Sequence, residues 1–360
     1  LRSLSNKTLT YINVIPTFIA LSLSVISLYN FSGLTSLIIF FISRSWIKLL
    51  TIYFFLDIKP NISFDKKIIT SILRFGAPLT ASTTIIMLNK EAPKIFCGLY
   101  LGTYQLGILS ALFLVIRPIS QLFDSSIFIF WIPILSKVKR DARVRFGEIF
   151  LKLRNFKLTI SIPILILIIT FNKNILSIFL PNNYEELSIY LPLICIFGIF
   201  RELNDTFFPT YVVLNKTKAQ LIIALIKLTL GCFLFFNFAN INLSSIIICS
   251  IFLEIVSILI SKYLISRTIN VNVFNQILTL KNIIISNSLL FFFSYILVFY
   301  IQKTNSNFFL ILTFFSSLLI YIFAIIALDK KVFFEYVGLL NLIFSKSKIS
   351  FNFLKRLSDN

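Results

Sequence analysis

The stretch LIIALIKLTLGCFLFFNF, which runs from Leu221 to Phe238, decides the class of fold. Lys227 is its only charged residue. As an α-helix the stretch would be ~27 Å long, close to the ~30 Å hydrocarbon core of a bilayer. It therefore predicts a membrane-spanning helix with one lysine inside the membrane.

The whole chain shares this apolar character. Apolar residues make up 58% of its 360 residues, Phe alone contributes 42, and only 13% of the residues are charged. The mean hydropathy is +0.93. A single soluble core does not hide that much apolar surface, so the main solvent of the protein must be lipid.

Ten stretches are long and apolar enough to cross a bilayer, some with extension at their ends. They are Tyr11–Tyr29, Leu34–Leu56, Phe75–Leu88, Gly107–Leu135, Leu158–Phe171, Leu187–Leu214, Leu221–Phe238, Leu243–Ile265, Ile283–Ile301 and Phe308–Leu328. Helices satisfy their own backbone hydrogen bonds in lipid. We therefore predict an all-α polytopic membrane protein with about ten transmembrane helices.

The positive charge fixes the predicted orientation. The formal net charge is +20, from 34 Lys and Arg against 14 Asp and Glu. If residues 1–10 are cytoplasmic, the cytoplasmic side holds 25 of the 34 cations and the opposite loops hold Lys90, Lys94, Lys173 and Lys303. The positive-inside rule then places both termini in the cytoplasm. Most of the charge marks topology, and no nucleic-acid partner is expected.

Two segments outside the spans combine basic and apolar residues. They are residues 136–157 and the tail 329–360. We expect both to lie as amphipathic segments on the anionic inner leaflet. A regulatory contact with lipid or protein is the alternative.

Composition excludes several kinds of soluble chemistry. Without His the chain has no imidazole base, imidazole metal ligand or His-containing triad. Cys97, Cys195, Cys232 and Cys249 show no C-x-x-C spacing and are expected to be packing residues. No Gly-rich phosphate loop is present. We expect no catalytic residue, metal or cofactor.

Ionisable residues inside the predicted spans are the candidate functional residues, because charges at that depth usually face a bundle interior or a water-filled cavity. The cations are Arg44, Lys48, Arg117, Arg201 and Lys227, and the acids are Asp124, Glu202, Asp205 and Glu254. They either neutralise each other, as Arg201 and Asp205 could at i,i+4, or form a cationic cavity. Five cations against four acids favour the cavity, which would select anions such as phosphates.

Five motifs resemble those of polysaccharide (Wzx-type, O-antigen or repeat-unit) flippases of the MATE-like multidrug/oligosaccharidyl-lipid/polysaccharide exporter superfamily. LRFGAPL (Leu73–Leu79) resembles the start of a helix after a basic loop, and FCGLYLGTYQLG (Phe96–Gly107) resembles a short external loop. WIP (Trp131–Pro133) before a basic segment, IFLPNNY (Ile178–Tyr184) and LNKTK (Leu214–Lys218) are similar to later helix ends and loops.

The resemblance implies a bundle of two six-helix lobes with an incomplete N-terminal lobe. Residues 1–67 would supply the last two helices of that lobe and a cytoplasmic linker, 68–266 the C-terminal lobe, 267–328 two additional helices, and 329–360 the tail. Since the chain begins at Leu1, we expect four spans to precede it in a longer protein.

The resemblance also implies a function, which is moving a polyprenyl-pyrophosphate-linked oligosaccharide across a bacterial cytoplasmic (inner) membrane for surface polysaccharides such as the O-antigen of lipopolysaccharide. The pyrophosphate would contact Arg117, Arg201 and Lys227, with Arg44 and Lys48 from the other lobe. The four acids would couple transport to H⁺ or Na⁺, or serve as local counter-ions. Expected partners are the glycan lipid, membrane lipids and other polysaccharide-assembly proteins.

Other functions stay open. A lipid II flippase handles the same pyrophosphate chemistry, whereas a drug or cation antiporter of the same superfamily would have cationic substrates that a positive cavity repels. A membrane polysaccharide polymerase is an enzyme, and it would be expected to carry a large external loop. The longest predicted outward loop, Asn89–Leu106, is short.

Overall fold

The computed structural model describes residues 6–29, 32–56, 66–141, 145–179, 186–269, 273–301 and 307–328. Helices make up nearly all of this described part, and it contains no strand. The prediction of an all-α polytopic membrane protein is therefore confirmed. The chain divides into two compact units, residues 1–70 and 71–360, each described by itself below.

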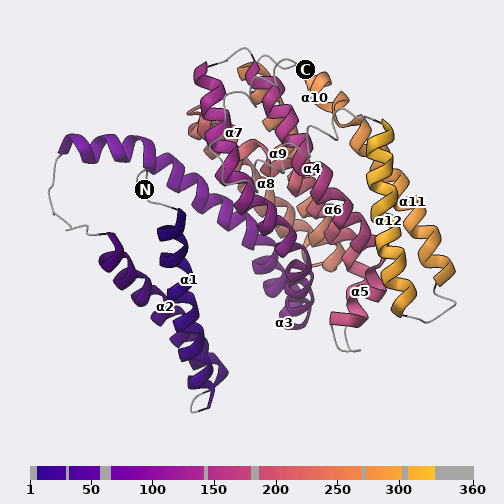
Figure 1. Cartoon of the computed structure of the whole chain (residues 1–360), viewed down its shortest axis with the longest axis horizontal. Coiled ribbons are helices and arrows are strands. Elements are labelled where there is room, and N and C mark those ends of the chain that lie inside the picture. Colours follow the sequence, from indigo (N-terminus) through magenta and orange to yellow (C-terminus); the bar gives the residue numbers. More distant parts are fainter. Residues whose placement is uncertain are drawn as a thin grey trace. The chain divides into compact units, whose positions relative to one another are not determined.

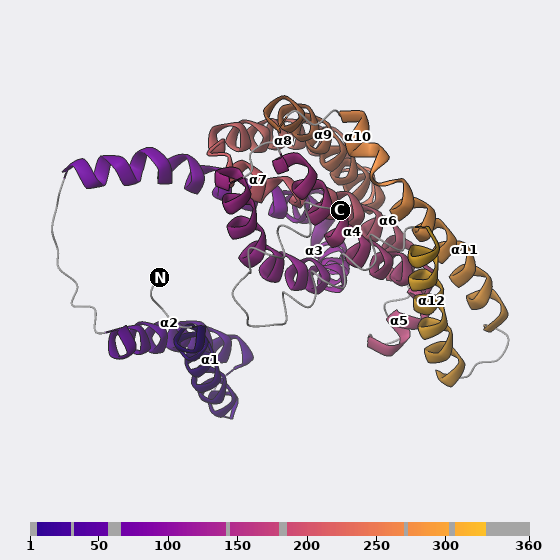
Figure 2. The ribbon, with the colours of Figure 1, turned by 45° about the horizontal axis from the view of Figure 1, so that its top comes forward.

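The first unit is a pair of apolar helices, α1 (Asn6–Leu28) and α2 (Gly33–Leu56), which lie side by side (Figures 1 and 2). The buried positions of α1 follow one face and include Ile12, Ala20 and Ser27. Small residues on such a face let two helices approach closely in a membrane. Most of the large apolar side chains on both helices are exposed, as expected for surfaces that contact lipid.

The second unit begins within α3 (Lys66–Asp141), which consists of two helical halves joined at Gly102. Gly102 has φ 83° and ψ 179°, a conformation that is essentially restricted to glycine. Lys94 Nζ lies 5.6 Å from the ring centroid of Phe113, so the chain folds back at Gly102 and the halves run side by side. The apolar segment Thr80–Gln121 is 42 residues long, about twice a single bilayer crossing.

The predicted outward loop Asn89–Leu106 is therefore wrong, since helix occupies this segment up to the turn at Gly102. The charges that suggested a loop are accommodated on the helix. Glu91 Oε2 and Lys94 Nζ, at i,i+3, form an ion pair at 2.8 Å. Lys90 and Lys94 consequently lie on a helical face and not in an external loop.

The remaining helices complete the second unit. They are α4 (Phe146–Thr170), α5 (Asn172–Phe179), α6 (Leu187–Asp205), α7 (Phe207–Val213), α8 (Thr217–Phe238), α9 (Leu243–Ile269), α10 (Val273–Leu278), α11 (Lys281–Ile301) and α12 (Asn307–Leu328). Helix α6 packs against both α4 and α9 (Figure 1). Helix α9 also packs on α8, and the pair α11–α12 packs on α4 through α11.

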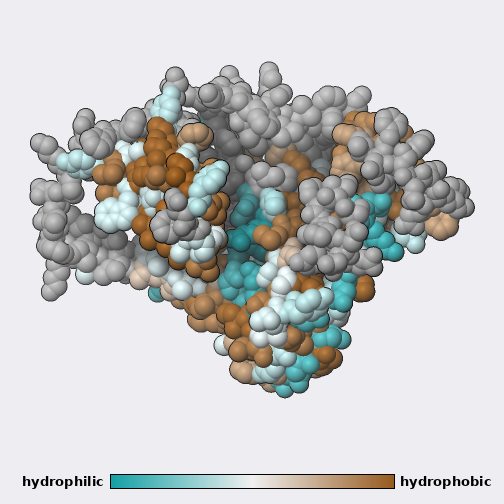
Figure 3. Space-filling view, turned by 90° about the horizontal axis from the view of Figure 1, so that it is seen from below, coloured by the Kyte–Doolittle hydropathy of each residue, from teal (hydrophilic) through white to brown (hydrophobic). Residues whose placement is uncertain are grey.

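Eight helical segments of the described part are long and apolar enough to span a membrane, and Leu312–Leu328 is a shorter apolar helix. The ten predicted stretches all lie on these helices, because two of them fall on the two halves of α3. Hydrophobic side chains form several patches on the described part of the surface shown in Figure 3. All four cysteines are free thiols and three are buried, in agreement with a packing role.

Two of the hydrophobic clusters of the second unit lie at different levels along its helices. One contains Leu112 of α3, Cys195 of α6 and Ile247 of α9. The other contains Trp131 of α3 and Phe150 of α4, together with parts of α7, α8 and α9. Between the two clusters, α3, α4, α6, α8 and α9 each carry polar or charged side chains, and these side chains build the candidate site.

Candidate functional site

The most deeply buried charges join three helices. Lys157 Nζ of α4 lies 3.1 Å from Glu202 Oε2 of α6, and the two side chains are only 2% and 0% exposed. Ser120 of α3 donates a hydrogen bond to Glu202 Oε1 at 2.7 Å. Lys157 and its neighbour Arg154, which is 1% exposed, therefore lie in the interior, whereas the basic segment 136–157 was expected to lie on a membrane surface. Glu202 has a cationic partner on another helix, which favours the counter-ion interpretation for it.

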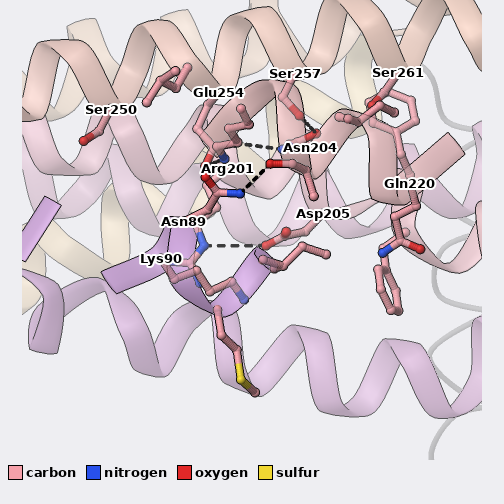
Figure 4. Close-up of a pocket in the computed structure, with 18 of the residues that line it drawn as sticks. Asn89, Lys90, Arg201, Asn204, Asp205, Gln220, Ser250, Glu254, Ser257 and Ser261 are labelled. Carbon is pink, nitrogen blue, oxygen red and sulfur yellow. Dashed lines mark hydrogen bonds and ion pairs between the residues drawn. The ribbon is translucent and has the colours of Figure 1, made fainter. Parts of the chain in front are cut away.

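A pocket of about 310 Å³ lies beside this pair and is lined by α3, α6, α7, α8 and α9 (Figure 4). We call it the polar pocket. Its charged residues are the cations Lys90, Arg201 and Lys227 and the acids Asp205 and Glu254. The prediction had selected four of these five residues from the sequence.

Most charges of the polar pocket are paired. Lys227 Nζ lies 2.6 Å from Glu254 Oε1, and Arg201 Nε lies 3.7 Å from Asp205 Oδ2 along one face of α6. The i,i+4 pairing of Arg201 and Asp205 is thereby confirmed. Asn204 donates through Nδ2 to Glu254 Oε2 at 2.8 Å. The pocket is consequently close to neutral, and its acids have local counter-ions.

Helix α9 presents a row of polar residues to the polar pocket. Ser250, Glu254, Ser257 and Ser261 line it, at spacings of four, three and four residues (Figure 4). Ser257 donates a hydrogen bond to Asn204 Oδ1 at 3.1 Å. Only Glu254 of this row is a predicted site residue. The signal was available, since polar residues at helical spacing on so apolar a span mark an inward face.

Gln220 of α8 lines the pocket as well, and Figure 4 shows it on the same side of the pocket as Ser261. Its side chain is only 5% exposed. Neither its amide nitrogen nor its amide oxygen has a hydrogen-bond partner among the described residues. Buried amides normally satisfy both groups, so Gln220 stands out from the other polar residues of the pocket.

A second and larger cavity of about 790 Å³ lies between the two halves of α3 and α6. We call it the cationic cavity. Its cations are Lys90, Lys94, Arg117 and Arg201, and among the described residues that line it Glu91 is the only acid. Glu91 is already engaged by Lys94. No acid of the described part of the chain lies within 4 Å of Lys90 or Arg117.

The two cavities adjoin each other, because Lys90 and Arg201 line both. Arg117 and Arg201, predicted to act together, share the cationic cavity, and Lys227 lies in the polar pocket. Lys90 and Lys94 are site residues that the sequence does not predict. Their charges are typical of an external loop, whereas the turn at Gly102 brings them beside Arg117.

The roles of all the predicted site residues stay predictions, and three of these residues lie in the other unit or have side chains outside the described residues. Arg44 and Lys48 lie exposed on α2, in the other unit, and Arg44 lies over the ring of Phe40 at 6.0 Å. Their contribution to the site stays a prediction. The side chain of Asp124 on α3 lies outside the described residues.

Comparison with known proteins gives a family match. The family described as "Polysaccharide biosynthesis protein" matches residues 1–189, more than half of the chain. No curated protein and no solved structure matches it. The matched region contains α1 to α5, and therefore Lys90, Lys94 and Arg117 of the cationic cavity, whereas most of the polar pocket lies beyond it.

Proposed function

Because the chain belongs to the polysaccharide biosynthesis protein family, we propose that it is a flippase. The protein is a multi-pass membrane protein with a role in polysaccharide biosynthesis. Its substrate in this proposal is an oligosaccharide linked to a polyprenyl pyrophosphate. The flippase moves this substrate from the cytoplasmic to the outer leaflet of a bacterial cytoplasmic membrane, with both ends of the chain in the cytoplasm.

The cationic cavity is the observation that carries the proposal. Of its four cations, Lys94 and Arg201 have acids within 4 Å, whereas Lys90 and Arg117 have none among the described residues. The cavity lies among helices that are apolar enough to be surrounded by lipid. An excess of positive charge within a membrane is costly unless an anion or water compensates it. A pyrophosphate supplies such an anion, and the guanidinium of Arg117 suits it through two parallel hydrogen bonds.

The same observation ranks the rival functions. A net positive cavity repels cationic drugs, so a cation antiporter is disfavoured. A lipid II flippase carries the same pyrophosphate, and it differs from the proposed flippase only in the identity of the sugars on its substrate. A polymerase would be expected to need a large external segment, and helix occupies the longest one predicted, 89–106, up to Gly102. Transport therefore fits better than catalysis.

Ion coupling stays a prediction within this proposal. Glu202, Asp205 and Glu254 each lie within 4 Å of a cation, which supports a counter-ion role. A counter-ion that exchanges its partner during transport would also couple to H⁺ or Na⁺. Dependence of transport on either gradient would separate the two roles.

The test is the double variant Arg117→Ala/Arg201→Ala. Because it removes half of the cavity's cations, we expect loss of surface glycan at a normal amount of membrane-inserted protein. Arg117→Lys keeps the charge without the guanidinium fork and should retain part of the activity. Lys173→Ala, at an exposed lysine of α5 that lines neither cavity, is the matched control.

The same variants in reconstituted vesicles distinguish transport from polymerisation. A fluorescent glycan on a polyprenyl pyrophosphate should change leaflet without changing chain length. Normal glycan in the double variant, or chain elongation by the purified protein, would refute the proposal.

A further inference from the structure

The polar pocket differs from the cationic cavity in the ligand chemistry it suits. Two of its three cations are held by acids at 2.6 and 3.7 Å. What the polar pocket offers a ligand is therefore mainly hydrogen bonding and apolar contact, in contrast to the excess of positive charge next to it.

Gln220 gives the polar pocket unused hydrogen-bonding capacity. Its amide is buried, lines the pocket and has an unpartnered donor and an unpartnered acceptor. A group that both accepts and donates a hydrogen bond would satisfy both atoms, and a hydroxyl or an acetamido group does so. Leaving a buried amide without partners is unfavourable, so a complementary ligand gains from pairing with it.

The remaining lining of the pocket suits a sugar ring. Phe207, Phe208 and Tyr211 of α7 are aromatic residues of this pocket, and Ser257 and Ser261 lie on the α9 face. A sugar has apolar C–H faces that pack against aromatic rings and hydroxyls around its edge. The volume of about 310 Å³ is at the lower end for small-molecule sites, which fits a short part of a glycan.

We infer that the polar pocket binds one uncharged sugar residue of the glycan, with Gln220 as a specificity-determining residue that hydrogen-bonds a hydroxyl or acetamido group of that sugar. This inference rests on the proposed function, because the pyrophosphate occupies the adjoining cationic cavity. Lys90 and Arg201, which line both cavities, mark where the phosphate part of the ligand meets the sugar part.

The test compares soluble short-chain probes bound to the purified full chain in detergent. One probe is farnesyl pyrophosphate, and the others carry glucose, galactose, N-acetylglucosamine or N-acetylgalactosamine on the same pyrophosphate. We expect at least one sugar to lower the Kd about tenfold relative to that of farnesyl pyrophosphate, as roughly one good hydrogen bond would. We call this gain in affinity the sugar margin. Gln220→Leu should abolish that margin and change the Kd of farnesyl pyrophosphate less than about twofold.

A matched control is Gln105→Leu. Gln105 also has a buried amide oxygen without a hydrogen-bond partner, but it lines neither cavity. The sugar margin should survive this substitution. If Gln220→Leu does not accumulate, Gln220→Asn withdraws the amide by one methylene and should reduce the margin several-fold.

The outcomes separate this inference from the proposed function. Suppose that farnesyl pyrophosphate binds but that no sugar adds affinity, or that the affinity gained from the sugar persists in Gln220→Leu. The polar pocket is then not a sugar site, and the flippase proposal stands. If farnesyl pyrophosphate does not bind the wild-type chain, or binds Arg117→Ala/Arg201→Ala equally well, the cationic cavity is not a pyrophosphate site and both proposals fail.

Discussion

The cationic cavity and the polar pocket share Lys90 and Arg201, so their charge balance differs through the residues that they do not share. In the polar pocket, Lys227 lies 2.6 Å from Glu254, and Asp205 also lines the pocket beside Arg201. In the cationic cavity, Arg117 has no acid within 4 Å among the described residues. The difference shows that depth in the membrane does not by itself identify a functional charge. The charges that remain unpaired after folding are the ones available to an anionic ligand.

The largest expected effect comes from breaking the buried pair beside both cavities. Lys157→Met leaves Glu202 charged and uncompensated in the interior, which should destabilise the protein by about 3–5 kcal/mol. Thermal unfolding in detergent measures this loss of stability. Pyrophosphate binding in the cationic cavity and sugar binding in the polar pocket should decline together. The double variant Lys157→Met/Glu202→Leu should recover most of the stability, because replacing both partners of a buried pair is often neutral. No recovery would mean that the pair does more than neutralise itself.

A smaller effect is expected from a substitution that gives the polar pocket the excess positive charge of the cationic cavity. Glu254→Gln removes the acid that neutralises Lys227 and should cost about 1–3 kcal/mol. The polar pocket then carries excess positive charge, so we expect a second pyrophosphate to bind per chain, measured by titration calorimetry.

The matched substitution in the cationic cavity is Glu91→Gln. Glu91 is exposed and its pair with Lys94 should contribute only ~0–1 kcal/mol. We expect tighter binding of pyrophosphate there and no additional site. An unchanged stoichiometry in Glu254→Gln would break the comparison, since it would show that charge balance does not distinguish the two cavities.

The smallest effect concerns stability without ligand. Gln220→Leu removes a buried amide that lacks partners, and we expect the ligand-free protein to be unchanged or up to about 1 kcal/mol more stable. The melting temperature in detergent reports this change. A clear loss of stability would indicate that Gln220 supports the fold, and its proposed role toward a sugar would lose its physical basis.

Much of the fold could be predicted because hydropathy is a local property. Each of the ten predicted stretches lies on a helix, since a run such as Leu221–Phe238 carries its own signal. The segment around Lys90 could not be predicted in the same way. Its charges are typical of a loop when only neighbours along the chain are considered. Helix α3 accommodates them because they line a cavity that is also formed by the second half of α3 and by α6.

The candidate site was predictable only in part. Arg117, Arg201 and Lys227 were selected because they lie deep in apolar spans, and all three line the two cavities. Lys157 was assigned to the basic segment 136–157 outside the predicted spans, and its pairing with Glu202, on another helix 45 positions later, is a tertiary contact. Gln220 gave no signal, since an uncharged residue near the end of a span is unremarkable until its burial and its missing partners are known.

The sequence by itself determined that the protein is surrounded mainly by lipid, which segments form helices and which residues carry charge. These properties follow from composition and from the length of apolar runs. The tertiary structure decided which charges cancel and which stay available. The physical reason is the range of the interactions. Helix formation and burial in lipid depend on neighbours along the chain, whereas an ion pair inside a membrane depends on which helices pack together. The turn at Gly102 shows the difference, because one residue brings Lys90 and Lys94 beside Arg117 and thereby creates the cationic cavity.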